Sequence, residues 1–332
     1  MTLPRLLPIV FILTLTGCAS MFAAPSSATP PENLYSRTLI DPATGEVISL
    51  AQAADALADA DVVVVGEYHS HPASHLLQAD LQSALYRQNP DQILTMEQFE
   101  LDHQADLNAY LAGDTGETEM IEDTGAWDNY RGSYRPLVEF ARQHELPVIA
   151  ANAPGDIVRC VGRQGADYLA TLPPEQRATL PEYPFQDTPA YREKFVAAIA
   201  GSHGSESAEL SGRMLNIYHA QLLRDTTMAA RIAEAHRQHP RHQILHTTGT
   251  FHSEERLGTV AALQALAPEL TIRVISPVFW PEGETTLALE SHRKAGDLLY
   301  AVLPLPPAYR NPDRERKAMA ERFKRPPDDA CA

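Results

Sequence analysis

Residues 61–69 read Asp-Val-Val-Val-Val-Gly-Glu-Tyr-His, and this stretch decides the fold class. Four consecutive valines are typical of a β-strand that is buried on both faces, and Gly66 and Glu67 end the apolar run. A buried strand followed by a helical pattern is the repeating unit of a parallel sheet. The segment therefore predicts an α/β domain with a mainly parallel central sheet flanked by helices.

The same alternation continues along the chain. Five more apolar runs predict strands at residues 93–96, 148–151, 243–246, 272–275 and 298–303. Helical patterns cover residues 72–88, 101–111, 135–144 and 210–238. These elements predict one α/β domain over residues 35–305.

Two segments depart from the alternation. Residues 155–212 contain prolines and helical fragments, which predicts a helical cap inserted between two strands of the sheet. Residues 306–332 are dense in Pro, Arg, Lys and Asp, and we expect this polar tail to be disordered or to form an exposed helix.

The N-terminus has the pattern of an export signal. One basic residue precedes a short apolar run that ends in Leu15-Thr16-Gly17-Cys18, and the run is too short to span a bilayer. Small residues before Cys18 indicate a lipobox, so we expect a signal peptide of residues 1–17 and acyl chains such as palmitate on Cys18. The alternative is an ordinary signal peptide with a chance cysteine. Ala19 favours the outer membrane, facing the periplasm, and residues 18–34 are expected to be a flexible tether.

The charge and the remaining cysteines narrow the possibilities further. The formal net charge of −16 disfavours nucleic acid as a partner. An oxidising periplasm is able to join Cys160 and Cys331. Because Cys331 is the penultimate residue of a polar tail, we expect two unpaired thiols instead.

Polar side chains stand at the ends of four of the predicted strands. They are Glu67, Glu97, Asn152 and the pair His246 and His252. The carboxyl ends of parallel strands share the edge at which ligands bind. One such side chain alone is more typical of a helix cap, but several together favour a shared site, because gathering ionisable groups is costly unless a ligand compensates them.

Three further histidines follow the first strand, and His71 precedes a proline, which makes His69 and His75 the better candidates. His69 and His75 add imidazole groups to this edge, and imidazole with carboxylate is a ligand set for Zn, Fe or Cu. Their spacing matches no standard zinc motif, and His75 is equally well explained as a hydrogen-bonded helix residue. Glu67, His69, Glu97 and His252 together also fit a metal-dependent hydrolase that activates a water molecule.

The predicted helix at residues 210–238 carries a polar pair in an apolar stripe. Gln221 and Asp225 interrupt apolar residues at spacings of three and four, so they are expected to be buried and to need partners. One interpretation is that Asp225 orients a histidine or arginine behind the site. The alternative is an internal salt bridge from Asp225 to Arg224 or Arg231.

Six ordered blocks of sequence carry a resemblance to a known family. The blocks are G-E-Y-H at 66–69 with H-L-L-Q at 75–78, M-E-Q-F at 96–99, Y-R-P-L-V-E-F-A-R at 134–142, A-A-N-A-P at 150–154, A-Q-L-L-R-D-T-T-M-A at 220–229 and G-T-F-H at 249–252. The chain resembles the ChaN family of haem-binding lipoproteins, within the superfamily of the Tiki metalloproteases and erythromycin esterases. Phe251 departs from the pattern, in which a small residue is expected.

The resemblance implies a function in haem and iron uptake without catalytic turnover. It implies a homodimer that encloses two stacked haems and a haem receptor or transporter as a partner. A tyrosine would ligate ferric iron, because phenolate is a hard anionic donor that haem proteins use. The competing hypothesis is the hydrolase with a divalent metal.

Three aromatic residues are the candidates for the haem pocket. Tyr134 is the first candidate ligand, since it lies in a matching block near Trp127 and Tyr130, which together would sandwich a porphyrin. The alternative for Tyr134 is a packed residue at the start of a helix. The resemblance also implies that a histidine of the other subunit contacts a haem propionate. The candidates for that contact are His69, His75 and His252.

Overall fold

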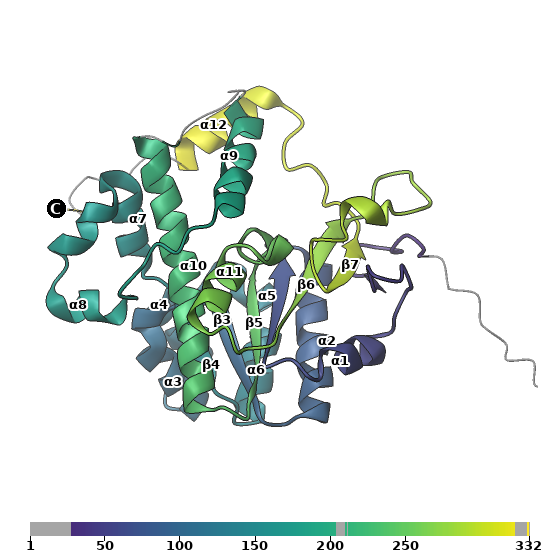
Figure 1. Ribbon diagram of the computed structural model, residues 1–332, viewed down its shortest axis with the longest axis horizontal. Coiled ribbons are helices and arrows are strands. Elements are labelled where there is room, and N and C mark those ends of the chain that lie inside the picture. Colours follow the sequence, from purple (N-terminus) through teal and green to yellow (C-terminus); the bar gives the residue numbers. More distant parts are fainter. Residues whose placement is uncertain (1–27, 204–209, 211, 323–330, 332) are drawn as a thin grey trace, which may run out of the picture.

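The computed structural model describes residues 28–203, 210, 212–322 and 331 (Figure 1). Cys18, the expected signal peptide and the first part of the expected tether lie outside these residues. Among the helices described, none combines the length and the apolar character that a membrane span needs.

The centre of the domain is a seven-stranded sheet in the order β1-β7-β6-β2-β5-β3-β4. The strands are β1 (Thr38–Ile40), β2 (Val62–Glu67), β3 (Gln92–Glu100), β4 (Val148–Asn152), β5 (Gln243–Gly249), β6 (Ile272–Phe279) and β7 (Leu298–Val302). Strands β2 to β7 pair in parallel, and β1 pairs antiparallel with β7 at one edge. The predicted α/β class with a mainly parallel sheet is confirmed, and the three-residue strand β1 is an addition that the sequence pattern missed.

Helices cover both faces of the sheet. One face carries α1 (Leu50–Leu57), α2 (Pro72–Gln88), α3 (Gln104–Ala112), α4 (Glu117–Thr124), α5 (Tyr130–Ser133) and α6 (Arg135–Gln143). The other carries α10 (Arg213–Gln238) and α11 (Thr259–Leu266). The valine run explains this sandwich, because Val63 and Val65 pack into the first layer while Val62 and Val64 pack into the second.

Helix α10 joins the sheet to the segment that was expected to be a cap. Its C-terminal half places Ala229 and Ile232 against the sheet. Its N-terminal half packs Leu223 against α7 (Gly155–Gln164) and Leu222 against α9 (Pro189–His203). Helix α8 (Pro174–Thr179) lies between them in the chain. Figure 1 shows these three helices grouped around the upper part of α10, on the side toward which the strands point.

The C-terminal segment corrects one prediction. Helix α12 (Pro312–Arg322) lies within the tail for which disorder or an exposed helix was expected, and residues 312–321 are exposed apart from Ala318. Cys331 forms a disulfide with Cys160 of α7, so the expectation of two unpaired thiols was wrong. The polar tail gave no indication that it returns to α7, 171 residues earlier in the chain.

Strand lengths decide which polar residues reach the sheet edge. Strand β3 continues to Glu100 and β5 continues to Gly249, further than the apolar runs indicated. Glu97 therefore lies inside β3, and His246 lies in the middle of β5 opposite Thr95 and Val64. The prediction that His246 stands at a strand end was wrong, because the polar residues Thr247 and Thr248 continue the strand.

Candidate functional site

Glu67, the last residue of β2, is the hub of the first half of the site. Its Oε1 atom accepts from the hydroxyl of Tyr134 at 2.6 Å and lies 2.7 Å from Nδ1 of His69. Its Oε2 atom accepts from Nε2 of Gln78 at 2.6 Å, and Nδ1 of His75 lies 3.6 Å away. The carboxylate is buried, so these donors replace the water it loses.

Glu97 is the hub of the second half. Its Oε2 atom accepts from the hydroxyl of Thr248 at 2.7 Å and from the backbone N–H of Gly249 at 2.6 Å, both at the end of β5. Its Oε1 atom lies 3.5 Å from Nε2 of His252, which belongs to the short 3-10 helix η3 (Thr250–His252). Two buried carboxylates from neighbouring parts of the sheet thus face the same strand-end edge.

Asp225 of α10 holds His252 from the other side. Its Oδ1 atom lies 2.7 Å from Nδ1 of His252 and accepts from the hydroxyl of Thr259 at 2.8 Å. Its Oδ2 atom accepts from the hydroxyl of Tyr191 at 2.6 Å, and Gln221 donates to that hydroxyl at 3.1 Å. The contact between Asp225 and a histidine is the one that the first interpretation of the polar pair proposed.

The positive charge on His252 and the negative charges on Glu97 and Asp225 stabilise one another, which shifts the pKa values of Glu97 and His252. Burial alone would raise the pKa of Glu97, but the charges on His252 and His69 and the donors at Gly249 and Thr248 outweigh it and lower that pKa to about 2. Burial lowers the pKa of the His252 imidazole, yet the charges of Asp225 and Glu97 raise it overall. Glu97 is therefore ionised at neutral pH.

His69 is the accessible member of the site. Its side chain is 46% exposed, and burial of the rest of the ring opposes a charge that Glu67 and Glu97 favour, so its pKa is raised. The ring meets the edge of Trp127 at a centroid distance of 5.1 Å. A Cβ atom on Gly249 would lie 2.7 Å from Nε2 of His69, so any larger residue there would displace this ring.

Tyr134 and Tyr130 belong to the core under the site. Tyr134 is fully buried, and burial together with the charge of Glu67 raises its pKa far above the usual value. Tyr130 is also buried, and its hydroxyl has no hydrogen-bond partner among the described residues. Of the three aromatic candidates, Trp127 alone is partly exposed, so an open pocket lined by all three is absent from the described residues.

Three other candidates lie behind the edge. His75 is buried on α2, and burial lowers its pKa despite the nearby Glu67. His246 is buried in β5 beside the hydroxyl of Thr95, and burial lowers its pKa to about 4. Asn152 donates to the backbone oxygen of Glu97 at 3.0 Å and accepts from Ala153, so its amide links the end of β4 to β3.

Strained backbone lies in the loops next to the site. Ser70, directly after His69, has a φ of 65°. Glu255 and Arg256, shortly after His252, each have a φ of 60°. Left-handed conformations are uncommon for residues with a side chain, and three of the four described here flank the site, while Glu145 lies between α6 and β4.

Sequence reasoning left several members of the network unassigned. Gln78 was quoted within a block but received no role, and Thr248, Thr259 and Tyr191 were not singled out. The position of Gln78 one turn after His75 is the one signal that would have indicated it. Tyr191 lies in α9, far in sequence from any strand, and Thr259 is the first residue of α11.

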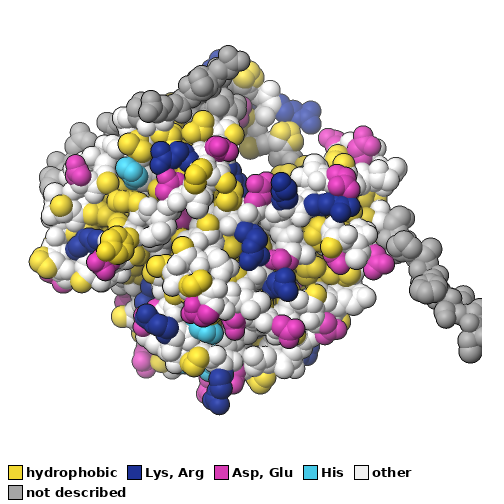
Figure 2. All heavy atoms as spheres, viewed as in Figure 1, with side chains coloured by type: hydrophobic (Ala, Val, Ile, Leu, Met, Phe, Trp, Pro, Cys, Tyr) yellow, Lys and Arg dark blue, Asp and Glu magenta, His cyan; other side chains and the backbone are white. Residues whose placement is uncertain are grey.

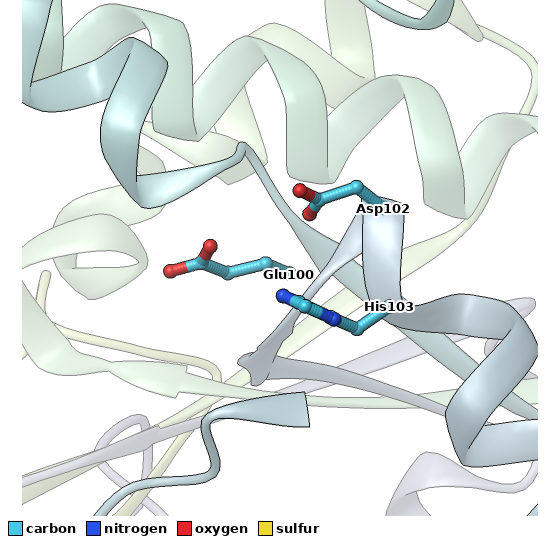
Figure 3. Close-up of side chains that lie close together, drawn as sticks. All are labelled: Glu100, Asp102 and His103. Carbon is cyan, nitrogen blue, oxygen red and sulfur yellow. The ribbon is translucent and has the colours of Figure 1, made fainter. Parts of the chain in front are cut away.

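The candidates for a metal centre do not gather at this edge. Among the described residues, the group whose ligand atoms lie mutually within 4.8 Å is Glu100, Asp102 and His103 (Figure 3). Glu67 with His69, and Glu97 with His252, form separate pairs. The geometry at the strand ends is therefore that of two hydrogen-bonded histidine–carboxylate pairs.

The fold and the site define an α/β protein with histidine–carboxylate pairs at the ends of its parallel strands. The model of the family described as haem-binding uptake, Tiki superfamily, ChaN matches residues 53–263. The chain belongs to this family, which confirms the resemblance seen in the six sequence blocks.

Comparison with one solved structure agrees with the fold. The structure of ChaN of Campylobacter jejuni with cofacial haem is 18% identical, covers 81% of this chain and 97% of that chain, and has a TM-score of 0.58. An open conformation of a mutant erythromycin esterase EreC is 14% identical with a TM-score of 0.43, covering 82% of this chain and 83% of that one. No curated protein sequence matches the chain.

Proposed function

We propose that this protein binds haem at the strand-end edge and takes part in haem or iron uptake. The observation that carries the proposal is the position of His69. It is the half-exposed imidazole of the site, and it stands between two buried carboxylates in a chain that belongs to a haem-binding family.

The chemistry of His69 fits the propionates of haem. Its raised pKa favours the imidazolium form, which pairs with a carboxylate of the ligand. Trp127 lies against the same ring and is partly exposed, so it offers an aromatic surface next to the cation. His252 is buried and bound to Asp225, so its role is to position Glu97 rather than to contact haem.

Tyr134 fits the role of an iron ligand only after a local change. Iron binds the phenolate, whereas the hydroxyl of Tyr134 is buried, donates to Glu67 and has a raised pKa. To reach a haem, this side chain would have to leave Glu67 and become exposed. The proposal for Tyr134 therefore rests on the family resemblance, and the structure gives it the role of a donor to Glu67.

The cellular setting belongs to the same proposal. Lipidation of Cys18 would hold the domain at the outer membrane, facing the periplasm, close to the route by which iron compounds enter. The solved relative from Campylobacter jejuni holds cofacial haem. A homodimer around two haems, with a haem receptor or transporter as partner, is the corresponding arrangement here.

Titration of the full-length protein with haemin tests the proposal. A saturable shift of the Soret band is expected, and its affinity should fall in a His69→Ala variant. Absence of any saturable shift would contradict haem binding.

A second candidate function is hydrolysis at the same residues. It is favoured by the pairs His69–Glu67 and His252–Asp225, which lie on either side of Glu97 and resemble the paired groups of general acid–base catalysis. A version with a metal-activated water would require Glu67, His69, Glu97 and His252 to move together around a divalent metal, because they now form two separate pairs. Hydrolysis of an activated ester that is lost in His252→Gln, with or without added zinc, would support it; equal rates in both proteins would exclude it.

A further inference from the structure

We propose that Glu100, Asp102 and His103 form a binding site for a divalent transition-metal ion, separate from the strand-end site. Glu100 is the last residue of β3, and the other two lie in the 3-10 helix η1 (Leu101–His103) that follows. One ligand atom of each side chain lies within 4.8 Å of the others. Figure 3 shows the three side chains projecting to the same side of the chain, with a ring nitrogen of His103 turned toward Glu100.

Glu100 and His103 are held in place by neighbouring groups. Glu100 Oε2 accepts from the backbone N–H of Gly155 at 2.7 Å, at the start of α7. A Cβ atom at position 155 would lie 2.5 Å from Glu100 Oε1, so the carboxylate occupies space that only a glycine leaves free. Nδ1 of His103 lies 3.3 Å from Asp106, which leaves Nε2 to face a metal. A carboxylate behind a histidine is the usual support of a metal-binding imidazole.

The charge of the group calls for a cation. Neither Glu100 nor Asp102 forms a salt bridge with a lysine or arginine of the described chain. A cavity of about 270 Å³ adjoins Asp102, and its lining adds the carboxylates of Asp156 and Glu175. Negative charges that face one another without a counter-ion repel, and a bound cation removes that cost.

The donor atoms indicate the class of metal. Two carboxylates and one imidazole suit Zn²⁺, Mn²⁺, Fe²⁺ or Co²⁺, whereas an all-oxygen set would suit Mg²⁺ or Ca²⁺. Bonds of about 2.0–2.2 Å would draw the three donors closer together than they lie now. Three protein ligands leave coordination positions open toward the cavity for water or a substrate oxygen.

Binding of zinc and manganese to the full-length, haem-free protein tests this inference. After dialysis against a chelator, calorimetric titration should detect one tight site per chain, and Co²⁺ should give an absorption band in the visible. Asp102→Asn and His103→Ala should each weaken binding at least about tenfold. Gly155→Ala should do the same, because its methyl group displaces Glu100.

Two controls make the outcome decisive. Asp114→Asn changes an exposed carboxylate beyond α3 and should bind metal like the wild type. A Glu67→Gln and His252→Gln double variant removes donors from the strand-end site and should also keep the metal. The inference would be overturned if Asp102→Asn and His103→Ala both bound the metal as tightly as the wild type. It would also be overturned if only the double variant lost the metal. Far-ultraviolet circular dichroism confirms that each variant is folded.

Discussion

The hydroxyl of Tyr134 donates to Oε1 of Glu67 at 2.6 Å, and the same oxygen lies 2.7 Å from Nδ1 of His69. One buried carboxylate thus connects a phenol in the core to the half-exposed imidazole at the surface. Because the carboxylate is shielded from water, its donors fix its orientation and that of His69. The core of the domain therefore positions the group that we propose to contact haem.

Tyr134→Phe is expected to destabilise the protein without changing the type of haem complex. Removing a donor to a buried charged acceptor costs about 1.5–3 kcal/mol, which urea denaturation measures. The Soret band should keep its shape, since the phenol is buried. Tyr183→Phe, at a 71% exposed position, is the matched control. A change of the spectrum from a tyrosinate-like to another type in Tyr134→Phe alone would instead assign this residue as the ligand.

His69→Ala should weaken haemin binding about tenfold, equivalent to about 1.4 kcal/mol. The reason is loss of a cation that pairs with a propionate. The wild-type affinity should also fall as the pH rises through the raised pKa of His69, because the imidazole then loses its charge. His144→Ala is the control, because His144 follows the C-terminal end of α6, whereas Tyr134 precedes its N-terminal end. Equal affinities for haemin in His69→Ala and His144→Ala would remove His69 from the site.

The pair His252 and Asp225 predicts how stability depends on pH. The pKa of His252 is raised in the folded chain, so its imidazolium stabilises the fold fully below the unfolded value of about 6.5. That stabilisation is lost as the pH rises through the folded value. The difference in unfolding free energy between wild type and His252→Gln should therefore be larger at pH 5.5 than at pH 9. The effect of His252→Gln should lose this pH dependence when Asp225 is already replaced by Asn. If it is still larger at pH 5.5 than at pH 9 in the Asp225→Asn protein, Asp225 is not the group that raises the pKa of His252.

The disulfide between Cys160 and Cys331 should contribute to stability. Closing a loop of more than a hundred residues constrains the unfolded chain, and such cross-links contribute about 2–5 kcal/mol. Cys331→Ser should lower the midpoint of thermal unfolding under oxidising conditions. Under reducing conditions the wild type and the variant should unfold together; a difference that persists in reductant would point to packing rather than to the cross-link.

Much of the fold was predictable because the chain places buried strands where its valines and isoleucines run together. The run Val62–Val65 fixes β2 and, through alternation, both helix layers. The strand ends were less predictable, since Thr247 and Thr248 are polar yet buried within β5. That extension moved His246 from the edge into the sheet.

The sequence predicted which residues form the site better than it predicted what each of them does. Glu67 and His252 lie at one edge because β2 and β5 end there, and Glu97 reaches the same edge from inside β3. Burial could not be read from local sequence, so Tyr134 was indistinguishable from an exposed ligand. The return of Cys331 to α7 depends on contacts between segments 171 residues apart, which no local pattern encodes.

Titration of the full-length protein with haemin, followed in the Soret region beside His69→Ala, tests the central claim most directly. The account predicts a saturable spectral change at one haem per chain, with about tenfold weaker binding in the variant. Sedimentation of the same samples shows whether haem brings two chains together. A spectrum that is unchanged at stoichiometric haemin, or that rises without saturation in both proteins, would contradict the account.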